Sequence, residues 1–323
     1  MALFLHNSSE WQFRSVTSSP QAIMNTADLL DRCRVEPGKK FRLKDYDPAW
    51  TGAGELKELA DKDARKETAQ AILNDSLVEL ADAQGRLYAD DRFALLIVLQ
   101  AMDAAGKDGT IKHVMSGVNP QGCQVYSFKQ PTPEELDHTF LWRYARCLPE
   151  RGRIGIFNRS YYEDVLVVRV HPERLGRQVP GNPDKKKFWK HRYEDIVAFE
   201  KHLVRNGTVV LKFFLHLSKE EQKKRFLERL DRPEKNWKFS PADITEREFW
   251  DQYTEAYEEA IAATSTEAAP WHVVPADHKW VTRAAVAGIV TGALRELDLK
   301  YPEVDEAGRA RLAEARRALL ADG

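Results

Sequence analysis

The distribution of apolar residues predicts five strands that alternate with longer helical segments. The strands are nearly continuous apolar runs, which is typical of a parallel sheet covered on both faces. The helical segments carry apolar residues at helical spacing and have end signals such as Thr132 and Gly207. We expect strands at 92–100, 123–128, 153–157, 208–217 and 271–275, single helices at 132–148, 185–207 and 280–297, and two helices within 218–263. This alternation predicts a three-layer α/β fold with a mostly parallel five-stranded sheet and helices on both faces.

Three further segments lie outside this alternation. Residues 1–54 are rich in turn signals and are expected to be irregular. Residues 55–88 contain many Ala, Leu, Glu, Asp and Lys residues and no Pro, which predicts a helical arm of one long helix or two, suited to oligomerisation. Residues 301–323 are expected to form a mixed-charge helical tail. We therefore expect a single domain over residues 55–300 that includes the arm.

Composition narrows the functional classes. The 323 residues are 43% hydrophobic and 31% charged with a net charge of -1, so no global field draws the protein to nucleic acid or to a membrane. The only cysteines, Cys33, Cys123 and Cys147, form no C-x-x-C pair, which argues against a zinc site or a disulfide framework. The N-terminus lacks the basic region of a signal peptide, and the densest apolar run, Phe93 to Leu99, is too short to span a bilayer. We expect a cytoplasmic protein.

A loop after the first predicted strand carries a phosphate-binding pattern. Residues 101–110 have the spelling A-x-D-x-x-G-K-D-G-T, whereas the usual one is G-x-x-x-x-G-K-[ST]. Lys107 supplies a cation beside backbone N–H groups at the start of a helix, which is a favourable anion site. A plain strand-to-helix turn is the alternative, and the strand–loop–helix context favours phosphate binding. The predicted phosphate loop includes Ala104, Ala105, Gly106, Asp108, Gly109 and Thr110.

Polar residues near the same sheet edge extend this candidate site. Asp103 places a carboxylate inside the loop, where it would repel phosphate unless it holds a cation, so we expect it to bind Mg²⁺. Asn158 and Arg159 follow the third strand, and the carboxyl ends of parallel strands share one edge. Arg159 is suited to bidentate phosphate contacts, whereas Asn158 either offers an oxygen to a metal or caps a turn.

Two basic segments are candidates for contacts with a polyanion. The segment 219–264 contains a Pro-broken basic turn and is expected to be a mobile lid, in which Arg229 and Arg232 face phosphates while Lys223 and Lys224 lie on a solvated face. A denser patch interleaves basic residues with Phe188 and Trp189 and suits either single-stranded nucleic acid or a track for a long polyanion. The patch comprises Lys185, Lys186, Lys187, Lys190 and Arg192, and Lys112 extends the positive surface.

Several of these segments together resemble the polyphosphate kinase 2 family. The resemblance covers roughly residues 30–300 and rests on "LQAMDAAGKDGTIKHV", "GVNPQG", "FNRSYYEDVLVVRVH", "NWKFSPAD" and "DHKW". It implies a fold like that of P-loop nucleotide monophosphate kinases with a helical lid. It also implies Mg²⁺-assisted, reversible phosphoryl transfer between inorganic polyphosphate and a nucleotide, with Mn²⁺ as the alternative metal. No covalent enzyme intermediate is expected.

The resemblance also assigns roles to residues. Asp103 and Lys107 match the loop acid and lysine of the family, and Arg159 and Arg229 match its two arginines. The sequence departs from the family at Asn158, where many members carry a metal-binding Asp, which leaves the number of metal ions open. Asp103, Lys107, Asn158, Arg159 and Arg229 are the expected catalytic residues.

The implied substrates are inorganic polyphosphate, AMP, ADP and ATP. "FNRSYYEDV" resembles the branch of the family that phosphorylates both AMP and ADP. We expect a homo-oligomer, a dimer or a tetramer, and no binding to nucleic acid or membrane. Two alternatives remain open on the sequence: an ATP-dependent nucleotide kinase of the same fold, and a non-catalytic protein that binds polyphosphate or nucleic acid.

Overall fold

Five parallel strands form the centre of the molecule. The computed structural model describes residues 32–51, 61–178 and 185–322. The strands are β1 (Ala94–Ala101), β2 (Cys123–Ser127), β3 (Ile154–Asn158), β4 (Thr208–His216) and β5 (Trp271–Pro275). They lie in the order β2-β3-β1-β4-β5, and every neighbouring pair is parallel. The five expected strands are confirmed. The runs of β1, β3 and β5 are buried along their whole length, whereas β2 at the edge of the sheet is partly exposed.

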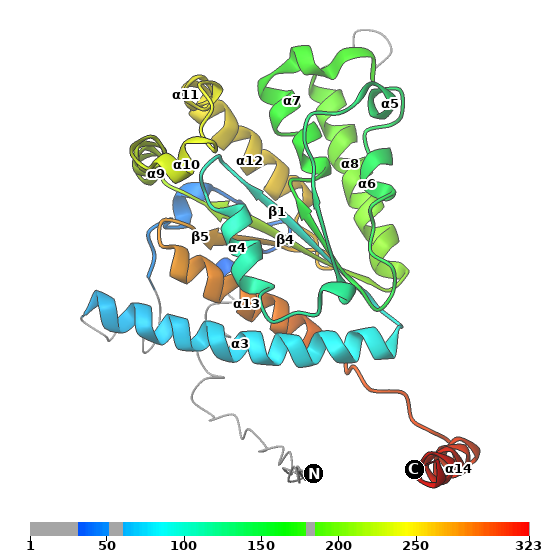
Figure 1. Cartoon of the computed structure of the whole chain (residues 1–323). Coiled ribbons are helices and arrows are strands. Elements are labelled where there is room, and N and C mark those ends of the chain that lie inside the picture. Colours follow the sequence, from blue (N-terminus) through cyan, green and yellow to red (C-terminus); the bar gives the residue numbers. More distant parts are fainter. Residues whose placement is uncertain (1–31, 52–60, 179–184, 323) are drawn as a thin grey trace.

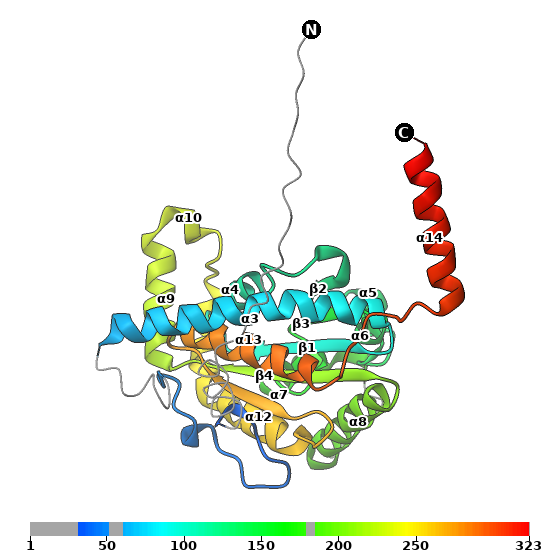
Figure 2. The ribbon, with the colours of Figure 1, turned by 90° about the horizontal axis from the view of Figure 1, so that it is seen from below.

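Helices cover both faces of this sheet (Figures 1 and 2). Alternate residues of β1 enter two separate cores, so that Leu95 and Ile97 face one way and Leu96 and Val98 the other. The first core is closed by α3 (Lys62–Asp90), α4 (Lys107–Val114) and α13 (Lys279–Arg295). The second is closed by α8 (Lys185–Arg205) and α12 (Trp250–Thr264). This is the predicted three-layer α/β arrangement.

The prediction of a single helix at 132–148 is wrong, because this segment forms two short helices. Thr132 caps a helix with Glu135 in a capping box, but α5 ends after one turn (Pro133–Leu136) and α6 spans only Trp142–Ala145. The chain bends between them, so that Arg143 reaches back to Glu135 at 3.2 Å, and the His138 ring stacks on Trp142 at 3.8 Å between ring centroids. These contacts outweigh a continuous helix because the bend contains Asp, His and Thr, which are weak helix formers.

Between β4 and β5 the chain forms the two expected helices, joined by short turns. The helices are α9 (Lys219–Asp231) and α12. The turns are α10 (Pro233–Asn236), which begins at a proline, α11 (Ala242–Glu246) and η5 (Arg247–Phe249). Figure 1 shows α9 to α11 on one side of the sheet edge and α5 to α7 on the other. The two groups therefore flank the same end of the molecule.

The remaining elements lie at the ends and in the connections. The arm is one helix, α3, within its described part, and α8 reaches Arg205 just before Gly207, whose φ of 88° is left-handed. Residues 1–31 and 52–60 of the expected N-terminal segment and arm lie outside the described residues. The tail forms α14 (Glu306–Ala321), which stands away from the rest in both views (Figures 1 and 2). Single-turn and short elements are η1 (Leu43–Asp45), η2 (Pro120–Gly122), η3 (Tyr161–Asp164), α7 (Val167–Val170) and η4 (Pro172–Gln178).

Across the part of the chain that the structure describes, we find no helix with both the length and the apolar character needed to cross a bilayer.

Candidate active site

The loop between β1 and α4 has the backbone shape of an anion site. β1 lies between β3 and β4 in the sheet, and the chain leaves it for β2 on one side, which places the loop at a topological switch point. Ala104 (φ 64°) and Gly106 (φ 105°) both adopt the left-handed conformation. Such residues turn successive N–H groups of a loop to one concave side. Gly106 is also the N-cap of α4 and offers no side-chain cap, so the helix N-terminus is open to an anion.

Lys107 and Thr110 supply a cation and a hydroxyl from the first turn of α4, next to this loop. Lys107 bends back over the loop and donates from Nζ to the Ala101 carbonyl at 3.0 Å. Burial and the positive charge of Arg159 hold the pKa of Lys107 below its ordinary value. Thr110 is buried in the first turn of α4, whereas Asp108 is exposed. In this arrangement the Lys107 ammonium lies close to the loop, where a phosphate oxygen can replace the Ala101 carbonyl as its acceptor.

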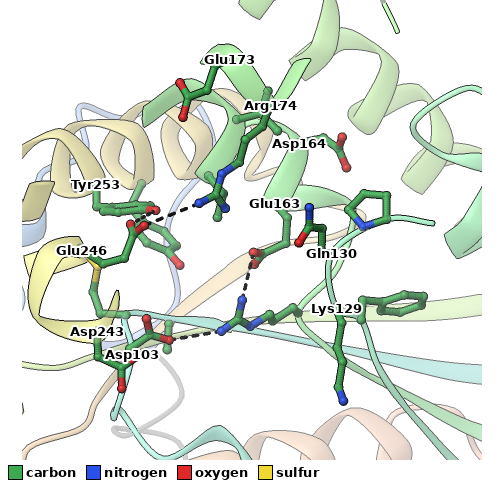
Figure 3. A pocket seen from close by; sticks show the side chains of 18 of the residues that line it. Asp103, Lys129, Gln130, Glu163, Asp164, Glu173, Arg174, Asp243, Glu246 and Tyr253 are labelled. Carbon is green, nitrogen blue, oxygen red and sulfur yellow. Dashed lines mark hydrogen bonds and ion pairs between the residues drawn. The ribbon is translucent and has the colours of Figure 1, made fainter. Parts of the chain in front are cut away.

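Asn158 and Arg159 reach the loop from the end of β3. The Asn158 Nδ2 group donates to Asp108 Oδ1 at 2.7 Å, so this side chain ties β3 to the start of α4. Arg159 is left-handed (φ 65°), and its side chain enters the cavity. There its guanidinium lies 3.2 Å from Asp103 and 3.7 Å from Glu163, the contacts drawn as dashed lines in Figure 3. Both carboxylates raise the pKa of Arg159, with Glu163 the stronger, so the group is a permanent cation.

A cavity of about 530 Å³ opens beside Asp103 and Arg159. Its two walls come from the segments that flank the sheet edge: α5 to η4 on one side and α11 to α12 on the other. Pockets of this volume hold ligands of roughly nucleotide size. Carboxylates from both walls face it (Figure 3), and aromatic side chains supply apolar surface. The carboxylates are Asp103, Glu163, Asp164, Glu173, Asp243 and Glu246, and the aromatic residues are Phe128, Tyr144, Trp250, Tyr253 and Tyr257.

Asp164 is a buried acid in the cavity wall whose pKa lies close to neutral pH. Burial raises its pKa to about 7, although the charges of Arg192 and Arg143 oppose that shift. The Tyr144 hydroxyl donates to its Oδ2 at 3.4 Å. Near neutral pH the group therefore exchanges between a hydrogen-bond donor and a charged acceptor.

Arg192 does not belong to an exposed basic patch. Its side chain is 6% exposed and its guanidinium lies 3.8 Å from the centroid of the Phe140 ring. It turns inward because α8 packs this side against the cavity wall, where Asp164 provides a charge partner. Lys187 and Lys190 are exposed on α8, and the side chains of Lys185 and Lys186 lie outside the described residues.

Lys112 does not extend the α8 patch either. It is exposed on α4, which closes the first core, whereas α8 closes the second on the opposite face of the sheet. On the α4 side, Lys279 and Arg283 lie at the start of α13, and Lys235 of α10 lies near Lys279. Burial, Arg225 and the other two cations lower the pKa of Lys279, since like charges disfavour its protonated form. A second group of cations thus lies near Arg225, whose guanidinium contacts the phosphate loop.

Arg229 and Arg232, the two arginines of the predicted lid, form hydrogen bonds and ion pairs with residues of the lid segment itself. Arg229 donates to the Lys238 carbonyl at 3.3 Å, lies 3.5 Å from Asp243, and is not among the described residues that line the cavity. Arg232 is half-exposed and pairs with Glu228 and Glu234. In this conformation neither guanidinium reaches the phosphate loop.

Sequence reasoning missed the residues of α9 and α11 that contact the loop or the cavity. Arg225 is 5% exposed and donates to the carbonyls of Ala104 and Ala105, and Gln222 donates to that of Asp103. In the sequence both stand among Lys and Glu residues, so the pattern resembles a solvated helix face. Asp243 lies within "NWKFSPAD", a segment that contributed to the family resemblance without a role for its acid.

The donor set suits a metal ion held mainly by substrate. Among the described residues there is no group of three or more His, Cys, Asp or Glu side chains placed to enclose a metal ion. Asp103 and Asp243 both present carboxylates to the cavity, and burial raises the pKa of Asp243. Mg²⁺ commonly takes one or two carboxylates and completes its shell with phosphate oxygens and water. The residues present fit that kind of site.

Comparisons with known proteins agree with this geometry. The family model described as polyphosphate kinase 2 (PPK2) matches residues 63–302. An ADP-polyphosphate phosphotransferase of Rhodopseudomonas palustris is 54% identical over 79% of this chain and 89% of its own length. An AMP/ADP-polyphosphate phosphotransferase of Meiothermus ruber is 47% identical over 86% of this chain and 97% of its own. The crystal structure of polyphosphate kinase 2 from Arthrobacter aurescens TC1 superposes with a TM-score of 0.77 and 40% identity, covering 93% of this chain and 97% of that one.

Proposed function

The chain belongs to the polyphosphate kinase 2 family, and from this premise we propose that it transfers a phosphoryl group from inorganic polyphosphate to AMP and to ADP. The observation that carries the proposal is the junction of a phosphate loop bearing Lys107 with a nucleotide-sized cavity that contains Arg159. The relatives named above are called polyphosphate phosphotransferases, which favours polyphosphate over ATP as the donor. Those names also argue against a non-catalytic binding protein.

We place the nucleotide in the cavity and the polyphosphate across the loop from it. The partly buried ring of Phe128 offers a surface against which a base stacks, as aromatic rings do for nucleobases generally. The cations Lys279 and Arg283 suit a chain of phosphates on the other side, whereas Lys235 is paired with Glu228. The two substrates then meet end to end over the loop amides.

Transfer in this arrangement requires mainly alignment and charge. The acceptor is itself a phosphate oxygen that is already anionic, so the attack needs no general base. The transition state spreads negative charge over the transferring group, which the loop N–H groups, Lys107 and Arg159 are placed to stabilise. Asp103 and Glu163 hold Arg159 in position before substrate arrives. Bound Mg²⁺, or Mn²⁺, would neutralise phosphate charge, with Asp103 and Asp243 as the residues that hold it.

We propose that α9 to α11 act as a lid. The segment contributes Gln222, Asp243 and Glu246 to the cavity wall, so its position changes the shape of the nucleotide site. Exchange of the Asp243 contact for a phosphate would free Arg229 to join the transferring group. We infer that Arg229 acts after substrate has bound.

A cytoplasmic location is also proposed. Cys33, Cys123 and Cys147 are free, and burial raises the pKa of Cys33 to about 12 and that of Cys123 to about 11. Such thiols are poor nucleophiles and behave as apolar residues, as in proteins of reducing compartments.

The test is a coupled assay with purified protein, long-chain polyphosphate and Mg²⁺, in which AMP and ADP are offered separately. We expect ADP to form from AMP and ATP to form from ADP. Turnover of a single acceptor would keep the family activity and remove the dual specificity. If neither acceptor is phosphorylated by polyphosphate while ATP acts as a donor, the protein is an ATP-dependent kinase and the proposal fails.

A further inference from the structure

Arg225 of α9 uses its whole guanidinium to bind the chain itself. A guanidinium has five N–H donors in a rigid plane, and here each has an acceptor. The side chain is 5% exposed, so these contacts are screened from water. Nε donates to Glu221 Oε1 at 2.9 Å, Nη1 to the carbonyls of Ala104 (3.0 Å) and Ala105 (2.9 Å), and Nη2 to the carbonyls of Ala276 (2.6 Å) and Asp277 (3.1 Å).

The four carbonyls belong to two loops at the same edge of the sheet. Ala104 and Ala105 lie in the phosphate loop, and Ala276 and Asp277 connect β5 to α13. Arg225 therefore joins α9, the phosphate loop and the start of α13 through a single planar group. Both loops also border the first core, which contains Ala105 and Ala276, so Arg225 adds a polar link to loops that already lie close together.

Gln222 adds a third loop carbonyl, that of Asp103, to the two that Arg225 binds. It lies one helical turn before Arg225, on the same face of α9, and its Nε2 donates to the Asp103 carbonyl at 2.9 Å. Its Oε1 accepts from Arg247 Nη1 at 2.6 Å, which fixes the orientation of the amide. Three consecutive loop carbonyls, those of residues 103, 104 and 105, thus bind side chains of α9.

Holding these carbonyls determines where the loop N–H groups point. A peptide unit is planar and trans, so the N–H of each following residue points away from the carbonyl that is held. The N–H groups of Ala104, Ala105 and Gly106 are therefore directed away from α9, and that of Ala105 donates to the Met102 carbonyl within the loop at 3.3 Å. The left-handed φ of Ala104, 64°, is unfavourable for a residue with a Cβ and persists where surrounding contacts fix it.

We propose that Arg225 is the positioning residue of the phosphate loop: it orients the loop amides toward phosphate and couples them to the placement of α9. It acts through the backbone and does not bind phosphate, since its donors are all in use. The inference rests on the proposed function only for its kinetic consequence. The orientation of the loop is a property of the protein without substrate.

The test compares Arg225→Lys with wild-type protein in two measurements. Lysine keeps the charge but offers three donors on one atom, so it cannot satisfy four carbonyls of two loops. Hydrogen–deuterium exchange of the peptide that covers residues 102–110 should become at least ~10-fold faster, as a locally opened segment does. The control is Lys223→Met, which removes an exposed cation two residues earlier on α9.

The kinetic measurement separates positioning from phosphate binding. We expect kcat with polyphosphate and ADP to fall at least ~10-fold in Arg225→Lys, because misplaced oxyanion donors cost roughly this much or more, with the KM for ADP within about threefold of wild type. Unchanged exchange of the loop, together with a raised KM for polyphosphate and a normal kcat, would show that Arg225 is a phosphate ligand and overturn the proposal. Unchanged exchange and unchanged kcat would also overturn it.

Two outcomes need a further variant or readout. If Arg225→Lys does not fold, Gln222→Met replaces it: loss of the Asp103 contact should accelerate loop exchange by a smaller factor, and exchange equal to wild type would contradict the inference. If wild-type protein shows no transfer from polyphosphate, the proposed function fails, while the exchange measurement still decides the role of Arg225.

Discussion

At the scale of single residues, the contact of Lys107 with a backbone carbonyl explains how a partly buried cation is kept available. Its Nζ binds the Ala101 carbonyl, and burial together with Arg159 lowers its pKa, so its charged form gains from a nearby anion. We predict that Lys107→Ala lowers kcat/KM by at least ~10²-fold, the magnitude seen when one donor to transition-state charge is lost. The coupled polyphosphate assay measures this. Lys201→Ala, which removes an exposed lysine of α8, should stay within twofold of wild type; equal activity of Lys107→Ala would exclude Lys107 from catalysis.

Asp164 predicts a dependence of stability on pH. Its pKa is about 7 in the folded protein and about 4 in an unfolded chain, so between these values the folded state binds more protons. The free energy of unfolding must then fall as pH rises from about 4 to 7. Asp164→Asn removes this term, so we expect the variant to gain roughly 1–4 kcal/mol relative to wild type on going from pH 5 to pH 8. Urea unfolding of both proteins at the two pH values measures the difference, and parallel pH profiles would contradict the assignment.

At the scale of elements, a buried ion pair joins β4 to α8 and to the segment after Arg159. Lys212 of β4 is 0% exposed and binds Glu200 of α8 at 2.6 Å. The hydroxyls of Tyr161 and Tyr162, in η3, donate to the other Glu200 oxygen at 2.9 Å. This network fixes η3, which carries Glu163 into the cavity.

Breaking this pair from one side should be costly. Lys212→Met leaves the Glu200 charge buried, and we expect a loss of about 3–5 kcal/mol in the free energy of unfolding. Combining Lys212→Met with Glu200→Gln removes both charges and should recover part of that loss. Urea unfolding of the single and double variants provides the measurement. A single variant as stable as wild type would mean that the pair contributes nothing to the core.

The elements also show where sequence reasoning succeeds and where it stops. Strands β1, β3, β4 and β5 were predictable because each is a local, mostly apolar run. The phosphate loop stays a prediction that rests on chemistry contiguous in the sequence. The break between α5 and α6 follows from weak helix formers in the bend together with the Arg143–Glu135 contact, and the apolar spacing alone does not reveal that contact. The burial of Arg192 and the contacts of Arg225 with the phosphate loop depend on packing between distant segments. A basic residue on an amphipathic helix has the same sequence pattern whether it is solvated or buried.

At the scale of the whole molecule, the sheet separates two groups of cations. Lys279 and Arg283 lie on the α13 side with the phosphate loop, whereas Lys187 and Lys190 lie on α8 across the sheet. The sequence predicts the α8 group as the polyphosphate track. Because Lys279 lies near Arg225, which binds the phosphate loop, we predict that the α13 group fills this role instead.

A pair of charge reversals compares these two positions. Lys279→Glu with Arg283→Glu should raise the half-saturating concentration of long-chain polyphosphate at least ~5-fold at low salt and less at high salt, with the KM for AMP nearly unchanged. The matched variant Lys187→Glu with Lys190→Glu should shift the half-saturating concentration by less than twofold. A larger increase in this concentration for the α8 variant than for the α13 variant would mean that polyphosphate binds along α8. Initial rates over a range of polyphosphate concentrations, at two salt concentrations, decide between the two.

The detached tail helix gives the molecule an apolar surface that its own body does not cover. Within α14 only Gly308 is buried, while Leu312, Leu319 and Leu320 are 60%, 76% and 68% exposed and repeat at spacings that place them on one helix face. Burying such a leucine contributes about 1.5–3 kcal/mol, so contact with a second copy of the chain would be favourable.

We predict that removing residues 303–323 lowers the mass observed in sedimentation velocity and leaves Tm within about 2 °C, because so little of α14 packs on the domain. In the full-length chain, Leu312→Asp with Leu319→Asp should have the same effect on mass, whereas Arg311→Ala, an exposed control on the same helix, should not. An unchanged mass for both the truncated chain and the double variant would mean that the tail helix takes no part in assembly.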